Sequence, residues 1–238
     1  MREMAVPGQT PGTGVGDAAV VRAREKEDIL VGDEIVRHRL SSRVIHWTVA
    51  LFFFLALLSG LPIWTPIFGW MATFFGGLNV CRWLHPWAGL AFAVASVVMF
   101  VHWASDMRLG KGDREWLSPR GIVRYFKYSG DDSQVGKYNG GQKLLFWAAE
   151  LGMLGLLLSG LVMWFPERFG QGLREVSYVV HDIAFIFFFA MIIGHIYLGT
   201  AAEPGTFGSM VRGTVTKSWA RLHHPRWYRD VTGEQPRR

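Results

Sequence analysis

Five histidines lie within or at the ends of long apolar segments, where an ionisable side chain is costly to bury and is usually functional. They are His46, His85, His102, His181 and His195. An imidazole nitrogen can bind haem iron, copper or zinc. The chain has one cysteine, Cys81, which excludes a CxxCH haem attachment and an iron–sulfur cluster held only by this chain's cysteines. The histidines are therefore the candidate ligands of any redox centre.

The histidines are carried by four apolar segments that are each long enough to cross a bilayer. We expect spans at about residues 44–63, 83–104, 144–165 and 176–200. A backbone that crosses lipid must satisfy its own hydrogen bonds, so each span is predicted to be a helix. The predicted fold class is an all-α membrane protein, a bundle of four transmembrane helices.

Basic residues gather before the first span, between the second and third spans, and after the fourth span. The positive-inside rule then places both termini in the cytoplasm. These loops account for the net charge of +6, so we predict no binding to nucleic acid. We expect a disordered cytoplasmic extension in residues 1–36, a four-helix region in 37–204 and a basic cytoplasmic tail in 205–238. Ser118 and Pro119 predict the start of a short interfacial helix.

Consecutive spans run in opposite directions, which sorts the histidines into two levels. His85 and His181 fall at the outer level, and His46 falls at the inner level. His195 lies fourteen residues after His181, roughly 21 Å deeper at 1.5 Å per residue and on the same helix face. The predicted pairs are therefore His85 with His181 and His46 with His195. His102 lies at the inner level and could replace one of that pair, although we favour an interfacial role for it.

Two imidazoles from facing helices are the ligands that a low-spin b haem needs, and they leave the iron no open position for substrate. Copper and zinc normally require a third or fourth ligand close by. The pattern thus indicates two haems stacked across the bilayer as an electron path. A haem-free transporter or scaffold is the alternative of another class. Transporters usually have helices broken near the midplane, whereas Pro62, Pro86 and Pro166 all lie near span ends.

A short internal repeat links the first and third spans. The sequence Leu-Leu-Ser-Gly-Leu occurs at residues 57–61, followed by Trp64, and again at residues 157–161, followed by Trp164. The small Ser-Gly pair allows the close approach of either a neighbouring helix or a flat macrocycle. Both explanations stay open from the sequence.

Several segments resemble the gamma (cytochrome b) subunit of respiratory membrane-bound formate dehydrogenase. The similarity covers about residues 36–230 and is carried by Ile45-His46-Trp47-Thr48-Val49, Leu84-His85-Pro86-Trp87-Ala88-Gly89, Lys137-Tyr138-Asn139-Gly140-Gly141-Gln142-Lys143, Gly194-His195-Ile196-Tyr197 and His223-His224-Pro225-Arg226-Trp227-Tyr228-Arg229. Histidine-bearing helices also occur in hydrogenase cytochromes b, so another quinone-linked dehydrogenase, such as a membrane hydrogenase, is the alternative. The segment 137–143 and the tail favour the formate dehydrogenase family.

The resemblance implies which residues bind the cofactors. It matches the axial ligands of two b haems to His46, His85, His181 and His195. It also matches a quinone site beside the inner haem to Asn139, Gly141 and Gln142, with menaquinone or ubiquinone as substrate. The alternative for this segment is a glycine-rich turn that enters the third span. Glu150 in that span is a candidate proton relay, or else it hydrogen-bonds a neighbouring helix.

The resemblance also implies partners and a location. An iron–sulfur beta subunit would pass electrons from a molybdenum or tungsten alpha subunit, which oxidises formate, to the outer haem. This chain would not act on formate itself; it would transfer the electrons to a quinone on the cytoplasmic side. We therefore expect a multi-pass protein of the bacterial inner membrane, in contact with lipid.

Overall fold

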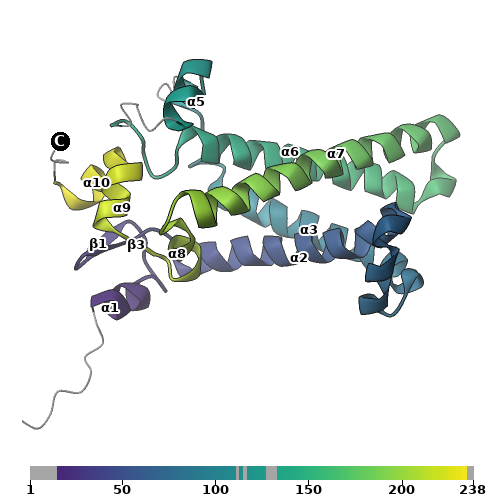
Figure 1. Ribbon diagram of the computed structural model, residues 1–238, viewed down its shortest axis with the longest axis horizontal. Coiled ribbons are helices and arrows are strands. Elements are labelled where there is room, and N and C mark those ends of the chain that lie inside the picture. Colours follow the sequence, from purple (N-terminus) through teal and green to yellow (C-terminus); the bar gives the residue numbers. More distant parts are fainter. Residues whose placement is uncertain (1–14, 111–112, 115–116, 127–132, 235–238) are drawn as a thin grey trace, which may run out of the picture.

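The computed structural model of the protein describes residues 15–110, 113–114, 117–126 and 133–234. Four long helices lie side by side in a bundle (Figure 1): α2 (Leu40–Trp64), α3 (Leu78–Trp103), α6 (Gly140–Trp164) and α7 (Gln171–Tyr197). Each is apolar and long enough to cross a membrane. The predicted fold class is therefore confirmed. The helices begin a few residues before the predicted spans, because each continues beyond its most apolar stretch.

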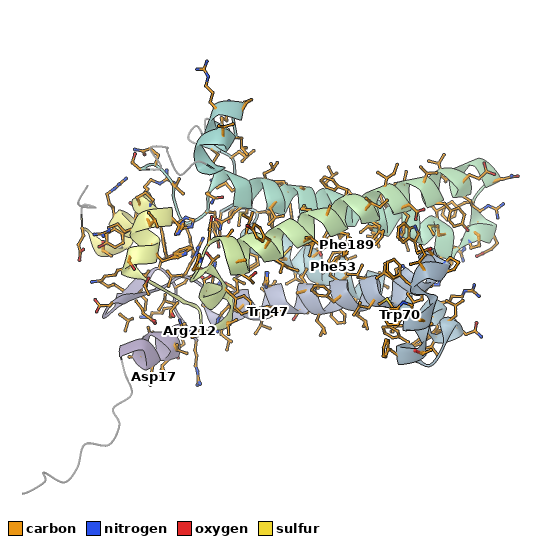
Figure 2. All side chains as sticks on the ribbon, viewed as in Figure 1. Asp17, Trp47, Phe53, Trp70, Phe189 and Arg212 are labelled. Atoms are coloured by element: carbon orange, nitrogen blue, oxygen red, sulfur yellow. The ribbon has the colours of Figure 1, made fainter. Side chains whose placement is uncertain are left out.

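The bundle is built from two antiparallel hairpins, α2 with α3 and α6 with α7. Aromatic rings fill the space between the hairpins at mid-height. The ring of Phe53 lies 5.1 Å from that of Phe188 and 5.7 Å from that of Phe92, centroid to centroid. Figure 2 places Phe53 in the middle of the bundle. Lipid is as apolar as these side chains, so their tight packing holds the hairpins together.

The first and the last described residues lie at the same end of the bundle, which we call the terminal end (Figure 1). The opposite, distal end carries the connections η1 (Pro66–Phe75) and η2 (Pro166–Arg168). Trp70 of η1 is exposed there (Figure 2).

Near the terminal end, α5 spans Pro119–Phe126, and the Ser118 hydroxyl accepts a hydrogen bond of 3.1 Å from the Gly121 amide. The predicted helix start at Ser118 and Pro119 is confirmed.

A small folded unit, here named the terminal cap, joins residues 15–36 to residues 206–232. It contains α1 (Val15–Arg22), β1 (Ile29–Val31), β2 (Glu34–Val36), α8 (Thr206–Val211), β3 (Thr214–Thr216), α9 (Lys217–His223) and α10 (Pro225–Thr232). The strands form one antiparallel sheet in the order β1-β2-β3, with Ile35 opposite Val215. Ile35 and Val215 pack with Trp219, Trp227 and Tyr228 in a shared core.

The terminal cap differs from the expectation that residues 1–36 are disordered. Residues 15–36 form a helix and a β hairpin, while residues 1–14 lie outside the described part of the chain. The strands have only three residues each, which is too short to show an alternating pattern. Their third strand and their aromatic core come from the other end of the chain, so no local signal predicts them.

Gly213 closes the junction between the terminal cap and the bundle. Its carbonyl accepts hydrogen bonds from the amides of Arg37 (2.8 Å) and His38 (3.2 Å). Its backbone is left-handed, with φ of +89°, and an added Cβ would lie 2.6 Å from the His38 carbonyl oxygen and 2.8 Å from Cβ of Ala23. The position therefore excludes any side chain.

The substitution Gly213→Ala should loosen the terminal cap. Gly233→Ala is the matched control, because Gly233 is also left-handed (φ of +70°) but has open space around it. Left-handed alanine costs about 1–2 kcal/mol at either site, and only Gly213→Ala adds the steric clash. A loss of about 1–2 kcal/mol corresponds to a roughly 5- to 30-fold faster hydrogen exchange. We expect the amides in 29–36 and 214–216 to exceed this acceleration in Gly213→Ala only. Equal exchange in both variants would show that close packing at Gly213 does not hold the cap.

Candidate functional site

The structure brings four of the five histidines together as two pairs. The imidazole centroids of His46 on α2 and His195 on α7 are 6.1 Å apart, near the terminal end. Those of His85 on α3 and His181 on α7 are 6.2 Å apart, near the distal end. These are the pairs that the helix directions predict. Each pair joins two different helices, and α7 takes part in both.

The spacing of each pair fits two imidazoles that share one metal ion. A metal–imidazole bond is about 2 Å long and the ring centroid lies about 1 Å behind the bonding nitrogen, so two rings on opposite sides of one ion have centroids roughly 6 Å apart. Both observed separations match this value. The arrangement therefore has room for an iron between the rings of each pair.

Hydrogen bonds orient the distal rings for this role. His85 donates from Nδ1 to the Ala56 carbonyl oxygen at 2.9 Å. His181 Nδ1 lies 2.9 Å from Oγ of Ser159, whose hydroxyl donates to the Gly155 carbonyl and so accepts from the ring. With the proton on Nδ1, the Nε2 lone pair of each ring is left for a metal.

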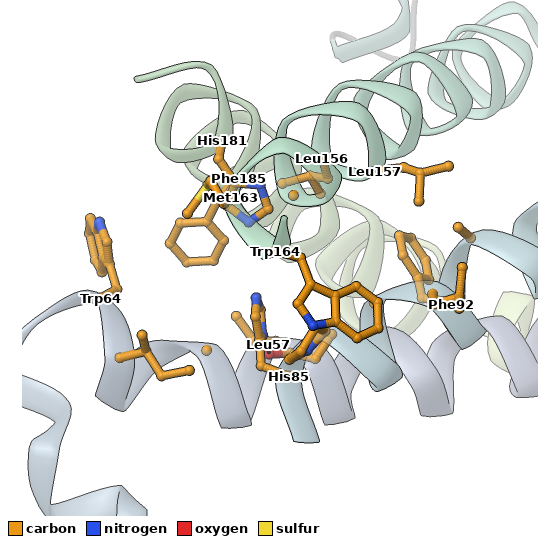
Figure 3. Close-up of a pocket in the computed structure, with 18 of the residues that line it drawn as sticks. Leu57, Trp64, His85, Phe92, Leu156, Leu157, Met163, Trp164, His181 and Phe185 are labelled. Carbon is orange, nitrogen blue, oxygen red and sulfur yellow. Dashed lines mark hydrogen bonds between the residues drawn. The ribbon is translucent and has the colours of Figure 1, made fainter. Parts of the chain in front are cut away.

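A cavity of about 500 Å³ lies around the distal pair. Figure 3 shows His85 and His181 approaching from facing helices, with Trp64 and Trp164 beside them. The lining is mainly apolar and also includes Arg82 and Asp182. A volume of this size is within the usual range for ligand and cofactor sites. The volume and the mainly apolar lining of the cavity, with two imidazoles facing into it, therefore fit a largely apolar macrocycle with a central metal.

The repeated Ser-Gly pairs lie next to the distal rings. A Cβ added to Gly60 would lie 2.7 Å from Cε1 of His85, and one added to Gly160 would lie 3.4 Å from Cε1 of His181. Each copy of the repeat thus meets one distal histidine. From the sequence, the repeat could serve helix packing or a cofactor. In the structure, Gly60 leaves room for the ring of His85, whereas a Cβ on Gly160 would be in ordinary contact with the ring of His181.

His102 is not part of either pair. Its Nε2 lies 2.9 Å from Oγ of Ser42, and its ring meets the edge of Trp103 at 4.8 Å between centroids. The interfacial role that the sequence favours for His102 stays a prediction. Over the described residues, no group of three or more His, Cys, Asp or Glu side chains is arranged to hold a metal ion.

The segment that resembles a quinone site begins α6 with a capping box. Asn139 Oδ1 accepts from the Gln142 amide at 2.9 Å, and Gln142 Oε1 accepts from the Asn139 amide at 3.0 Å. Both side-chain oxygens are thereby occupied, and both side-chain NH₂ groups are left to donate elsewhere. The spacing of an Asn and a Gln three residues later is the sequence signal for this motif, and it was missed.

Glu150 lies on α6 between Phe146, in the cluster near the terminal pair, and Met153, in the aromatic layer at mid-height. Its side chain is buried, with 9% exposure. Its Oε1 has no hydrogen-bond partner among the described residues. A buried carboxyl oxygen without a partner is costly, so this position still requires an explanation, and its role as a proton relay stays a prediction.

Comparison with known proteins gives consistent matches. The family described as prokaryotic cytochrome b561 matches residues 37–213. The cytochrome b556(Fdn) subunit of nitrate-inducible formate dehydrogenase from Escherichia coli K12 is 36% identical over 201 residues, which is 83% of this chain and 91% of that protein. The cytochrome b556(fdo) subunit from the same strain is 34% identical, over 84% of this chain and 94% of that protein. The formate dehydrogenase cytochrome b556 subunit of Haemophilus influenzae is 32% identical, over 86% and 87%.

Proposed function

This chain belongs to the prokaryotic cytochrome b561 family, and we propose that it is the cytochrome b subunit of a formate dehydrogenase. The family and the four apolar helices make it a multi-pass protein of the bacterial inner membrane with haem b as its cofactor. The subunits from Escherichia coli and Haemophilus influenzae that match over most of the chain, at 32–36% identity, are named for formate dehydrogenase. That agreement favours this function over a subunit of a membrane hydrogenase.

The two histidine pairs support a finer proposal of two haems. His85 and His181 would hold the outer haem at the distal end, and His46 and His195 would hold the inner haem at the terminal end. Two haems held by these residues would supply a one-electron route from an iron–sulfur partner outside to a quinone inside. The protein's own residues orient the distal imidazoles through the Ala56 carbonyl and the Ser159 hydroxyl. The layer of Phe53, Phe92 and Phe188 would keep the two haem levels apart.

The start of α6 supports the proposed quinone site. The first amides of a helix have no partner within it, so Gly141 N–H is a donor there, next to the side-chain NH₂ groups of Asn139 and Gln142. A quinone carbonyl accepts hydrogen bonds from neutral donors of this kind. The quinone, whether menaquinone or ubiquinone, would thus bind at the same end of the bundle as the inner histidine pair.

The orientation and the partners follow from the same proposal. By the positive-inside rule, the basic loops would lie in the cytoplasm, together with the terminal end and both chain termini. An iron–sulfur subunit would then contact the distal end and connect it to a molybdenum or tungsten subunit that oxidises formate. The four-helix region of residues 37–204 is the electron-transfer part, and this chain does not act on formate.

Two substitutions test the haem assignment. His85→Ala should remove one b haem and His195→Ala the other, because each leaves a single imidazole at its level. The number of haems per complex is measured by pyridine haemochrome, together with the dithionite-reduced spectrum of the purified complex. His102→Ala is the control and should keep both haems. One haem in the unmodified complex, or a haem lost in His102→Ala, would contradict the assignment.

The role of the Asn139 amide is tested by Asn139→Asp. The carboxylate keeps an oxygen to cap α6 but replaces the NH₂ donor, so the helix and the haem content should survive. Loss of one hydrogen bond to a bound carbonyl costs about 1–3 kcal/mol. The rate at which a short-chain quinone reoxidises the reduced haems should therefore fall roughly 5- to 150-fold. Asn139→Ala should add a loss of about 1 kcal/mol in helix stability. Unchanged reoxidation in Asn139→Asp would place the quinone elsewhere.

A further inference from the structure

We infer that the C-terminal tail positions the quinone-binding segment. The positioning residues are His224, Arg226 and Arg229 of the tail, together with Arg37 before α2. The inference rests on the proposed function, because it takes the start of α6 as the quinone site. It gives the tail a specific role at that site, in place of a general contact with the membrane surface or with a partner.

The tail and Arg37 donate hydrogen bonds to the backbone carbonyls of four of the five residues in 133–137. Arg229 Nη2 donates to the Ser133 carbonyl at 2.8 Å, and the Arg226 amide donates to the Val135 carbonyl at 3.0 Å. His224 Nδ1 donates to the Gly136 carbonyl at 2.7 Å. Arg37 Nη2 donates to the Lys137 carbonyl at 2.7 Å. All four donors are about ninety or more residues away in the chain.

These hydrogen bonds take the place of the helix or strand hydrogen bonds that residues 133–138 do not have. Residues 133–138 form neither helix nor strand, so they have no ladder of their own to fix the direction of the backbone. The segment leads directly into Asn139, the N-cap of α6. An Asn139 amide that must meet a quinone carbonyl therefore depends on the tail for its position.

His224 is the central contact of the tail. Its side chain is fully buried, at 0% exposure, and its ring lies 5.0 Å from that of Trp219. Burial, and then the nearby positive charge of Arg37, hold the pKa of His224 well below its usual value. The ring is thus neutral at physiological pH, and the proton that it shares with Gly136 stays on Nδ1. A Cβ on Gly136 would lie 2.5 Å from Nη2 of Arg226, the end of a flexible and exposed side chain that can move aside.

The N-terminal arm completes the network from the other side. Arg37 is 2% exposed and its guanidinium lies 4.7 Å above the ring of Trp219. Asp28 accepts from Lys137 Nζ at 3.0 Å and from Trp227 Nε1 at 2.8 Å. The tail, the arm and the segment before Asn139 are therefore tied at several points, and a change in the tail is transmitted to the start of α6.

The test compares two substitutions of one residue in the assembled complex. His224→Leu removes the donor to Gly136, whereas the side-chain NH₂ of His224→Asn can donate from close to the place of Nδ1. Loss of the bond should raise KM for a short-chain quinone about 10-fold with little change in kcat, consistent with roughly 1–3 kcal/mol for an unmade hydrogen bond. His224→Asn should restore most of the affinity. Arg221→Gln, an exposed change on the same helix region, is the control and should behave as the unmodified protein.

The outcomes separate this inference from the proposed function. Normal KM in His224→Leu with both haems present, or equal losses in the Leu and Asn variants, would overturn the positioning role. If Asn139→Asp leaves quinone reoxidation unchanged, the quinone site itself is wrong, whatever the tail does. Should His224→Leu not assemble, Arg229→Met removes the donor to the Ser133 carbonyl at a half-buried position. An unchanged KM in that variant would also overturn the inference.

Discussion

The meeting of an imidazole on one helix with an imidazole on another is the constraint on which the rest of the structure depends. Each pair ties two helices at a fixed distance, and α7 holds one ring of each pair on a single face. Gly60 on α2 makes space for the ring of His85, and Ser159 on α6 lies within hydrogen-bond distance of the ring of His181. The aromatic layer at mid-height fills the volume between the two levels. Helix spacing, glycine placement and core composition all follow from keeping four rings in position.

The sequence predicts what depends on short-range or periodic signals. Hydropathy gives the four helices, and the fourteen-residue spacing of His181 and His195 gives the shared face of α7. Ser118 and Pro119 give the start of α5, because capping is a local interaction. The role of the Ser-Gly repeat was left undecided, since a sequence does not show which ring a glycine will face.

The terminal cap could not be predicted, because its parts meet only in the folded chain. β2 has three residues, and it pairs with β3 from the far end of the sequence. Arg37 looks like one more basic residue before a membrane span, yet it is buried among aromatic rings and holds a carbonyl of a distant loop. His224 looks like part of a solvated tail, yet it is fully buried. Long-range burial of this kind leaves no periodic trace.

The internal repeat has a consequence for how the four helices divide their work. The copies on α2 and α6 match in the distal half, with Ser59-Gly60 on one helix and Ser159-Gly160 on the other. Carried toward the terminal end at the same offset, the match places Phe146 where α2 has His46. The match thus does not extend to the histidine, and α6 alone among the four helices carries no member of a histidine pair. In the proposed function, α6 is therefore the one helix of the bundle that holds no haem, and its first turn is where the quinone would bind.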